Sequence, residues 1–554
     1  MRKFKVGDEF EGVVSDFGMS GEGIVKDGAY PVFVPFAAVG ERVRVRIVHA
    51  KKDFAFGELI EVLEPSNDRI KPRCRYFGRC GGCDLQHLAW ARQEEVKRLN
   101  LQRTLHKTAG IDVEVPEVVS GAQWAYRNKL ALPFGTMGRH GKVVVGFYEK
   151  KSHRVVPLKD CPLHGEWAKR VIADVTDWAN ENGLKAYDEG TGRGLLRHLV
   201  ARYVSSLSVV LVVNGDGVPH IDNLARKLGE HFGEYALYVS PNKEKTNVIM
   251  GGSVKLVRGK ESPQKLGAFS AAVSPLSFLQ VNDEIRDRIY ADACAALSDF
   301  RGDVTELYSG VGLLTAELAL RLPDARITAA EIVPEAVDDA KRLMRRLGLA
   351  DRVTEVCADA ADYMRRLPQD GTPRALVLDP PRKGCDETVL AAAAEAGYER
   401  IVYISCNPAT LARDLKFLLS RGYTLSSVRP YDMFPQTMHV ETLVLLSKKK
   451  PDSHIVVDVE FGEGEGKISL KDALKRTEGR KPKSKTTYKD IQNYVEENYG
   501  FKVHTAYIAE VKRNLGLPMY DAPNAVEELK RPRSHPTEKM VLAIKETLAH
   551  FEII

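Results

Sequence analysis

The 554-residue sequence contains no apolar run that approaches the roughly 18 consecutive residues needed to cross a membrane. Residues 1–10 also lack the apolar stretch of a secretory signal peptide. Both absences argue against membrane insertion and secretion, so we expect a protein of the cytoplasm. The length is several times that of one ordinary domain, and 44% hydrophobic residues can form several globular cores.

Cysteine is scarce, with eight residues in the chain. Structural disulfides are rare in the cytoplasm, so clustered cysteines there indicate metal binding or catalysis. Cys74, Cys80 and Cys83 lie close together, and Cys161 follows far downstream. Four thiolates suit either a [4Fe-4S] cluster or a Zn²⁺ ion. The spacing therefore predicts a metal site and leaves both metals open.

The chain also has little net charge, +6 from 81 Lys and Arg against 75 Asp and Glu. This charge is distributed unevenly. Residues 65–160 carry 18 Lys and Arg against 9 Asp and Glu, whereas residues 1–64 are slightly acidic. A solvated basic face would explain the charge alone, but the asymmetry also suits a chain that holds a polyanion in one part and performs chemistry in another.

Hydrophobic periodicity predicts three folded parts before the tail. Residues 1–64 alternate apolar and polar positions in short runs, which indicates a small closed β-barrel of the OB type. Residues 65–265 form a mixed α+β region with the clustered cysteines, and its basic helix over 85–110 is expected to pack on the next domain. Residues 266–448 alternate strands and helices five times, which predicts a doubly wound, Rossmann-like α/β sheet.

The tail, residues 449–554, begins with a basic segment at 471–485. Helical periodicity follows over 488–499, 505–515 and 538–551. We expect a basic linker and a small helical module, to which the sequence assigns no role.

Acidic residues follow the first strands of the α/β region. Gly310 and Gly312 allow the first loop to approach a ligand closely, but the full glycine pattern of a dinucleotide site is missing. Glu331 ends the second strand, where a carboxylate can accept hydrogen bonds from both ribose hydroxyls, and Asp359 ends the third. This set favours a nucleoside, such as the adenosine of S-adenosyl-L-methionine, over a pyrophosphate.

The fourth and fifth strands end in residues suited to chemistry on a planar substrate. Asp379 precedes two prolines, which stiffen its loop. Cys406 lies between a strand end and a helix N-terminus, whose dipole we expect to lower the pKa of the thiol, as a nucleophile requires. Cys294 and Cys357, in contrast, are expected to be buried apolar residues.

Separate motifs along residues 1–448 occur together in one known family. They are CRYFGRCGGC, AYRNKL, Cys161-Pro162, SFLQVN, ELYSGVG, LDPPRKG, YISCNP and HVET. With these motifs the chain resembles the RNA (uracil-5-)-methyltransferases, in particular the bacterial 23S rRNA enzymes with a TRAM domain and an iron–sulfur cluster. The resemblance implies a cytoplasmic monomer that acts on a flipped-out uridine of 23S rRNA. It does not extend to the tail.

The resemblance also implies roles for individual residues. Cys406 matches the family nucleophile, and Glu441 matches the base that removes the C5 proton. The implied ligands of a [4Fe-4S] cluster are Cys74, Cys80, Cys83 and Cys161. The implied contacts with S-adenosyl-L-methionine are Gln280, Tyr308, Glu331, Asp359 and Asp379. The candidate contacts with RNA are Asp379, Gln280, Tyr126, Arg127, Asn128 and Lys129.

Two alternatives to a 23S rRNA methyltransferase stay open. The first is tRNA as the substrate, although the tRNA enzymes of this family usually lack both the barrel and the cluster cysteines. The second is an RNA-binding factor without catalysis, against which the presence of both Cys406 and Glu441 argues. The chain departs from the usual family pattern at Glu306 and Ser309, neither of which is catalytic in the family.

Overall fold

The computed structural model describes residues 4–150, 152–366, 373–448, 488–514 and 537–550. The chain divides into two compact units, Met1–Ser453 and His454–Ile554. Within the described residues, no helix combines the length and the apolar character needed to cross a bilayer.

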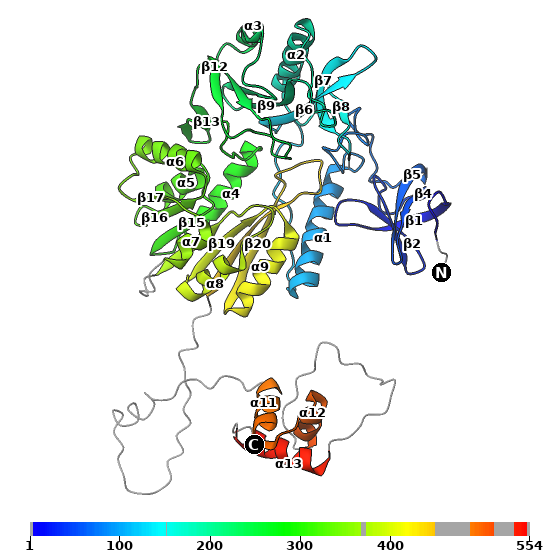
Figure 1. The fold of residues 1–554 in the computed structure, drawn as a ribbon, viewed down its shortest axis with the longest axis vertical. Helices are drawn as coiled ribbons and strands as arrows, with labels where there is room; N and C mark the ends of the chain where they lie inside the picture. The colour runs from blue at the N-terminus through cyan, green and yellow to red at the C-terminus, as the bar shows by residue number, and fades with distance from the viewer. Residues whose placement is uncertain (1–3, 151, 367–372, 449–487, 515–536, 551–554) are drawn as a thin grey trace. The chain divides into compact units, whose positions relative to one another are not determined.

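The first unit begins with a closed barrel of strands in the order β1-β2-β3-β5-β4, drawn in blue in Figure 1. Alternate positions point inward, so that Val14, Val25, Val32 and Val43 are almost fully buried. The barrel confirms the predicted OB-like fold. Its strands are β1 (Glu9–Phe17), β2 (Gly23–Asp27), β3 (Tyr30–Val34), β4 (Arg42–Ala50) and β5 (Ala55–Glu64).

A seven-stranded mixed sheet forms the central region, with the order β12-β11-β10-β9-β6-β7-β8. Helices α2 (Glu166–Glu181) and α3 (Ile221–Phe232) pack on it, and Trp178 is completely buried in that layer. The strands are β6 (Lys129–Met137), β7 (Lys142–Tyr148), β8 (Val155–Pro157), β9 (Leu196–Tyr203), β10 (Leu207–Val213), β11 (Tyr235–Pro241) and β12 (Lys255–Gly259). A short hairpin, β13 (Gln264–Leu266) and β14 (Phe269–Ala271), then leads to the second sheet.

The second sheet has the order β17-β16-β15-β18-β19-β21-β20. Strands β15 to β19 are parallel and alternate with helices, which confirms the predicted Rossmann-like domain. The chain direction across the sheet reverses between β15 and β18, which is where sheets of this kind bind their ligands. The elements are β15 (Asp303–Leu307), α5 (Leu313–Arg321), β16 (Ile327–Glu331), α6 (Pro334–Leu347), β17 (Val353–Cys357), α7 (Ala360–Arg365), β18 (Arg374–Leu378), α8 (Glu387–Ala396), β19 (Arg400–Ser405) and α9 (Pro408–Ser420).

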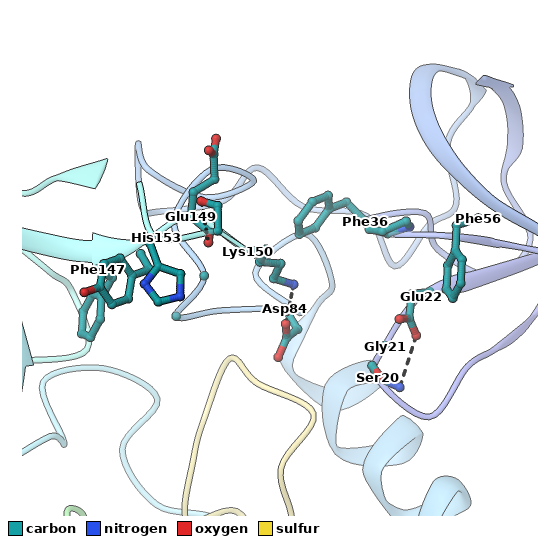
Figure 2. Close-up of a pocket in the computed structure, with 15 residues that line it drawn as sticks. Ser20, Gly21, Glu22, Phe36, Phe56, Asp84, Phe147, Glu149, Lys150 and His153 are labelled. Atoms are coloured by element: carbon teal, nitrogen blue, oxygen red, sulfur yellow. Dashed lines mark hydrogen bonds and ion pairs between the residues drawn. The ribbon is translucent and has the colours of Figure 1, made fainter. Parts of the chain in front are cut away.

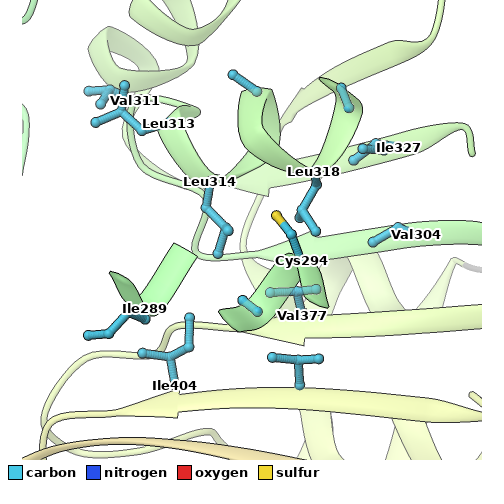
Figure 3. Packing of buried hydrophobic residues seen from close by; sticks show 14 of the residues in the cluster. Ile289, Cys294, Val304, Val311, Leu313, Leu314, Leu318, Ile327, Val377 and Ile404 are labelled. Atoms are coloured by element: carbon cyan, nitrogen blue, oxygen red, sulfur yellow. The ribbon is translucent and has the colours of Figure 1, made fainter. Parts of the chain in front are cut away.

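An apolar core supports this sheet on the side of α4 (Asp283–Ala295). Figure 3 shows Cys294 of that helix among the side chains of the core. Cys294 is 2% exposed, so it packs like an apolar residue, as predicted. The same prediction is wrong for Cys357, which is exposed because it ends β17, the edge strand of the sheet.

The last two strands of the sheet are absent from the sequence prediction. Strands β20 (Tyr423–Tyr431) and β21 (Glu441–Lys448) form a hairpin, and β21 lies antiparallel between β19 and β20. The sheet therefore continues beyond the five predicted crossovers. The insertion brings the start of β21 against the end of β19, at the carboxyl edge of the parallel strands.

Helix α1 (Trp90–Ala109) joins the N-terminal region to this sheet. It begins later than the predicted 85 because a turn occupies residues 86–87. The helix packs along α9, and its Leu101 and Leu105 are completely buried in the same core as Leu411. This basic helix is thus anchored on the α/β domain.

A buried ion pair strengthens the same contact. Lys97 Nζ on α1 donates to Asp432 Oδ1 at 2.6 Å and to the carbonyl oxygen of Phe434 at 3.2 Å. Both charged side chains are completely buried. Asp432 follows β20, so the pair ties α1 to the loop that leads into β21. A buried charge that loses its partner is costly, which makes this tie specific.

The second unit consists of three described helices, α11 (Tyr488–Tyr499), α12 (Thr505–Asn514) and α13 (Glu538–His550). Their apolar faces share one small core that contains Ile491, Ile508 and Ile544. This confirms the predicted helices of the tail. The basic segment at 471–485 lies outside the described residues.

Replacing Lys97 should strongly destabilise the first unit. Lys97→Met leaves the Asp432 carboxylate buried without its cation, which should lower the free energy of unfolding by about 3–5 kcal/mol. The double variant with Asp432→Asn should regain much of the loss. All four tryptophans lie in residues 90–178, so urea denaturation followed by tryptophan fluorescence reports on this unit.

A matched control lies on the same helix. Arg103 pairs with Asp16 across an exposed surface, where both side chains are at least 40% exposed. Arg103→Met should cost no more than about 1 kcal/mol, because water screens such pairs. Equal losses for Lys97→Met and Arg103→Met would contradict the importance of the buried pair.

Candidate active site

Two neighbouring strands place Cys406 next to Glu441. Cys406 follows β19 and Glu441 opens β21, and the register that pairs Ser405 with Thr442 brings both to one edge of the sheet. Glu441 is 2% exposed, whereas Cys406 is half-buried. A thiol beside a buried carboxyl group is an arrangement that can supply a nucleophile and a base to one substrate.

Local hydrogen bonds fix the backbone around Cys406. The side chain of Asn407 accepts a hydrogen bond from the backbone N–H of Ala409 at 3.0 Å and so caps α9. Pro408 occupies the first helical turn, where its missing N–H is not needed. Ser405 Oγ accepts from the Asn407 N–H at 3.2 Å. The turn from strand to helix is thus held on both sides of the thiol.

Burial raises the pKa of the Cys406 thiol to about 11, and the Glu441 carboxyl group adds to this rise. The Arg382 guanidinium acts in the opposite direction and lowers the pKa. The prediction of a lowered pKa is therefore wrong, because lost hydration and a neighbouring carboxyl outweigh the helix terminus. At neutral pH the thiol is protonated.

Two buried carboxyl groups, Glu306 and Glu441, and the half-buried Asp379 lie at the same edge. Burial raises the pKa of Asp379 to about 7, that of Glu306 to about 8 and that of Glu441 well above its usual range. Asp379 further raises the pKa of the other two by repulsion. Glu306 is held by a hydrogen bond from Thr315 Oγ1 to its Oε2 at 2.6 Å. Such a group of carboxyls favours a cationic ligand, such as a sulfonium or an ammonium group.

Glu331 shapes the loop after β15. Its carboxylate accepts hydrogen bonds from the backbone N–H of Gly310 at 3.0 Å and of Val333 at 2.9 Å. Tyr308 has a φ of +64°, a left-handed conformation that is rare for a bulky residue. Gly312, at +77°, approaches α6 so closely that a side chain would collide with it. Strained backbone of this kind clusters at ligand-binding sites.

The other two predicted ligand contacts have different settings. Asp359 Oδ1 caps α7 by accepting from the N–H groups of Ala361 at 2.9 Å and Asp362 at 3.3 Å. This capping alone accounts for an acidic residue at that position. Gln280 is 9% exposed, and its carbonyl oxygen accepts from Asn128 Nδ2 at 3.1 Å. Gln280 is therefore positioned by the central region.

The segment predicted to contact RNA connects the two sheets. Tyr126 and Asn128 are buried, and both donate hydrogen bonds to backbone carbonyls of the second sheet's domain. Arg127 lies over the ring of Phe434, 6.0 Å from its centroid. Burial lowers the pKa of Lys129 to about 8. The Tyr126 hydroxyl and the Asn128 amide nitrogen thus bond within the protein, whereas Asn128 Oδ1 is buried with no hydrogen-bond partner among the described residues.

The four predicted metal ligands line one cavity of about 40 Å³, whose other walls include Phe77, Phe147 and Leu163. They are Cys74, Cys80, Cys83 and Cys161. In the part of the chain that the structure describes, no group of three or more His, Cys, Asp or Glu side chains has an arrangement that would hold a metal ion. The fold thus brings the four thiols to one largely apolar cavity, but not into an arrangement that would already hold a metal ion.

Arg382 is a site residue that sequence reasoning missed. Its charge acts on both Cys406 and Glu441. Its carbonyl oxygen accepts from Asn407 Nδ2 at 3.2 Å, which connects the two loops. The signal lay in the motif that contains Asp379, where this arginine follows the two prolines.

Alkylation of Cys406 tests the electrostatics of the site. With a pKa of about 11, its reaction with iodoacetamide should still accelerate between about pH 8 and pH 10, where an ordinary thiol approaches saturation. Glu441→Gln should accelerate the reaction at about pH 9, because removing the negative charge lowers the thiol pKa. Peptide mass spectrometry resolves Cys406 from the exposed Cys357. A plateau below about pH 8 would contradict this picture.

Comparison with known proteins identifies both the α/β domain and the N-terminal barrel. Residues 269–449 match the family described as tRNA (Uracil-5-)-methyltransferase, and residues 3–60 match the TRAM domain. An uncharacterized RNA methyltransferase from Halalkalibacterium halodurans is 36% identical over 80% of this chain and 97% of its own length. Another, from Clostridium tetani, is 37% identical over 78% of this chain and 95% of its own length.

A solved structure has the same architecture. The Pyrococcus abyssi tRNA (uracil-54, C5)-methyltransferase, in complex with S-adenosyl-L-homocysteine, aligns with a TM-score of 0.63 and 26% identity. The alignment covers 79% of this chain and 99% of that one. With its barrel, its doubly wound domain and the pairing of Cys406 with Glu441, the chain belongs to the family of S-adenosylmethionine-dependent RNA (uracil-5-)-methyltransferases that carry a TRAM domain.

Proposed function

We propose that the protein methylates C5 of a uridine in 23S rRNA through a covalent adduct with Cys406. The observation that carries the proposal is the placement of Cys406 beside the buried Glu441 by adjacent strands. On this proposal residues 1–64 and 65–265 hold the RNA, while residues 266–448 perform the chemistry.

Cys406 and Glu441 each have a proposed role in the methylation of uracil. C5 of uracil is a weak nucleophile, so the Cys406 thiolate first adds to C6 and leaves an enolate with carbanion character at C5. C5 then attacks the methyl group of S-adenosyl-L-methionine, and the sulfur–methyl bond breaks to leave S-adenosyl-L-homocysteine. Glu441 then takes the C5 proton, and elimination restores the C5–C6 double bond and frees Cys406. Burial suits Glu441 to this task, because a raised pKa makes its carboxylate a stronger base.

The acidic residues at the carboxyl ends of the parallel strands support binding of S-adenosyl-L-methionine there. Tyr308 and Asp379 directly follow β15 and β18, between which the sheet order reverses, and Glu331 is the last residue of the neighbouring β16. The carboxyl groups suit the cationic end of the ligand, and Gln280 and Asp379 are the proposed contacts to both ligand and uracil. A cation bound here would also lower the pKa of Cys406 and favour its thiolate.

The choice of 23S rRNA rests on the barrel together with the four cysteines, a combination expected of the rRNA enzymes. The similarity to an archaeal tRNA (uracil-54, C5)-methyltransferase favours tRNA as a second candidate. Unmodified transcripts of 23S rRNA and of tRNA, incubated with the protein and labelled S-adenosyl-L-methionine, separate the two. Label in tRNA alone would overturn the rRNA proposal.

Two substitutions test the covalent mechanism. Cys406→Ala should abolish methylation and leave S-adenosyl-L-homocysteine binding unchanged, because the thiol is not a proposed contact of that ligand. Glu441→Gln should accumulate a methylated RNA adduct, since addition and methyl transfer precede proton removal. A denaturing gel detects it as a slowly migrating complex. Turnover by Cys406→Ala, or no adduct with Glu441→Gln, would refute the respective role.

The four cysteines are proposed to hold a [4Fe-4S] cluster. Four thiols suit iron–sulfur chemistry, and the apolar walls of the cavity, which Phe77, Phe147 and Leu163 form, would shield a cluster from water. The cluster would have a structural role, because Cys406 lies on a different domain. Arg127 also lines this cavity and lies over Phe434, so the site adjoins the loop that precedes β21.

Anaerobically purified protein should therefore be brown and contain about four iron and four sulfide per chain. Cys83→Ala should lose the iron and weaken RNA binding before it affects the chemical step. Cys294→Ala is the matched control, because this buried cysteine lies in the other core and should retain the iron. Stoichiometric zinc without sulfide would instead establish a zinc site.

A further inference from the structure

The loop of residues 382–385, which follows β18, carries Arg382 and is held by helix α9. The carbonyl oxygen of Arg382 accepts hydrogen bonds from Asn407 Nδ2 at 3.2 Å and from Thr410 Oγ1 at 3.3 Å. Both donors lie at the N-terminus of α9, directly after Cys406. The Arg382 side chain is exposed, so its position relative to Cys406 depends on the backbone of this loop.

Asp414, two turns further along α9, joins the same loop to the strand of the nucleophile. Its side chain is 1% exposed. Its Oδ2 accepts from the backbone N–H of Cys385 at 2.9 Å and from Tyr403 Oη at 2.6 Å. Tyr403 is completely buried on β19, three residues before Cys406. One carboxylate oxygen therefore connects loop 382–385 with the strand that ends at Cys406.

Arg413 completes this contact from the solvent side. Its Nε donates to Asp414 Oδ1 at 2.8 Å. Its Nη2 donates to the carbonyl oxygens of Lys383 at 3.0 Å and Cys385 at 3.1 Å. A buried carboxylate needs a partner of opposite charge. The same guanidinium thus neutralises Asp414 and binds the loop.

Gly384 allows the loop to approach α9 this closely. Its φ is +76°, and a Cβ atom there would lie 2.6 Å from both Asp414 Oδ2 and Arg413 Nη2. Its N–H donates to the carbonyl oxygen of Pro381 at 2.8 Å, which closes the turn. A side chain at this position would displace the two groups that hold the loop.

The placement of this loop matters for the thiol. Burial raises the pKa of Cys406 most, and Glu441 and Asp379 raise it further, whereas Arg382 is the charged group that lowers it. The interaction of two charges weakens as their distance grows. A loop that moved away from α9 would therefore remove the charge that favours the thiolate.

We propose that Asp414, together with Arg413, is a positioning group that keeps Arg382 close enough to Cys406 to favour the thiolate. Asp414 is not a proposed contact of RNA or of S-adenosyl-L-methionine, and it acts through the backbone of loop 382–385. The inference rests on the proposed function, since it takes Cys406 to be the nucleophile.

A double-mutant cycle on the full chain tests this role, with the rate of Cys406 alkylation by iodoacetamide at about pH 9 as the readout. Asp414→Asn should slow alkylation about threefold, because Arg382 then stabilises the thiolate less. A direct effect of the lost negative charge would instead accelerate the reaction. In an Arg382→Gln background, adding Asp414→Asn should leave the rate nearly unchanged.

Two tyrosine variants supply a conservative test and its matched control. Tyr403→Phe removes one donor to Asp414 and should also slow alkylation. Tyr423 is a buried tyrosine of the same core, whose hydroxyl donates to the carbonyl oxygen of Tyr398 at 2.8 Å. Tyr423→Phe removes a comparable hydrogen bond and should leave the alkylation rate unchanged. Urea denaturation verifies that each variant is folded.

The same variant should show its effect in turnover. With labelled S-adenosyl-L-methionine and unmodified 23S rRNA, Asp414→Asn should lower kcat about tenfold and leave both KM values nearly unchanged, because orientation rather than binding is lost. Three alkylation results would overturn the proposal: faster alkylation of Asp414→Asn, equal slowing with and without Arg382, or equal slowing in Tyr423→Phe. The expected alkylation rates in a protein that methylates no RNA would support the positioning role and overturn only the proposed function.

Discussion

The buried ion pair between Lys97 and Asp432 is the contact on which the arrangement of the first unit most depends. It joins a helix that follows the cysteine-rich segment to the loop that ends at Glu441. Since both side chains are fully buried, neither can leave the other without a large cost. The position of the proposed base is therefore coupled to the part of the chain proposed to hold RNA.

A second constraint is that several carboxyl groups lose hydration together at the carboxyl edge of the second sheet. Burial raises the pKa values of Asp379, Glu306 and Glu441, the charge of Asp379 raises those of the two glutamates further, and Glu441 in turn raises that of Cys406. A cationic ligand relieves this repulsion and favours the thiolate at the same time. Methyl-donor binding and nucleophile activation are thus physically linked in the proposed mechanism.

The loop that the ion pair holds also contacts the segment between the barrel and α1. The Met438 N–H donates to Asp84 Oδ2 at 3.4 Å, and Lys150 donates to the other oxygen of that carboxylate at 2.6 Å (Figure 2). On the barrel, the three arginines of β4 pair with glutamates of β1 and β5. A count of basic residues therefore does not locate an RNA surface, because the neighbouring glutamates already neutralise these arginines. Partners across strands decide which charges are available.

The sequence by itself determined the elements and their order: the barrel, the five alternations of strand and helix, and the tail helices all follow from local periodicity, which short-range sterics and hydrophobicity control. The position between a strand and a helix singled out Cys406, spacing singled out the clustered cysteines, and the family resemblance alone pointed to Glu441. Only the tertiary structure decided that β21 lies between β19 and β20, that Cys357 is exposed on an edge strand and that the Cys406 pKa rises. These properties depend on pairing and burial among residues distant in sequence, and desolvation by such neighbours outweighs the local helix dipole on which the sequence argument relied.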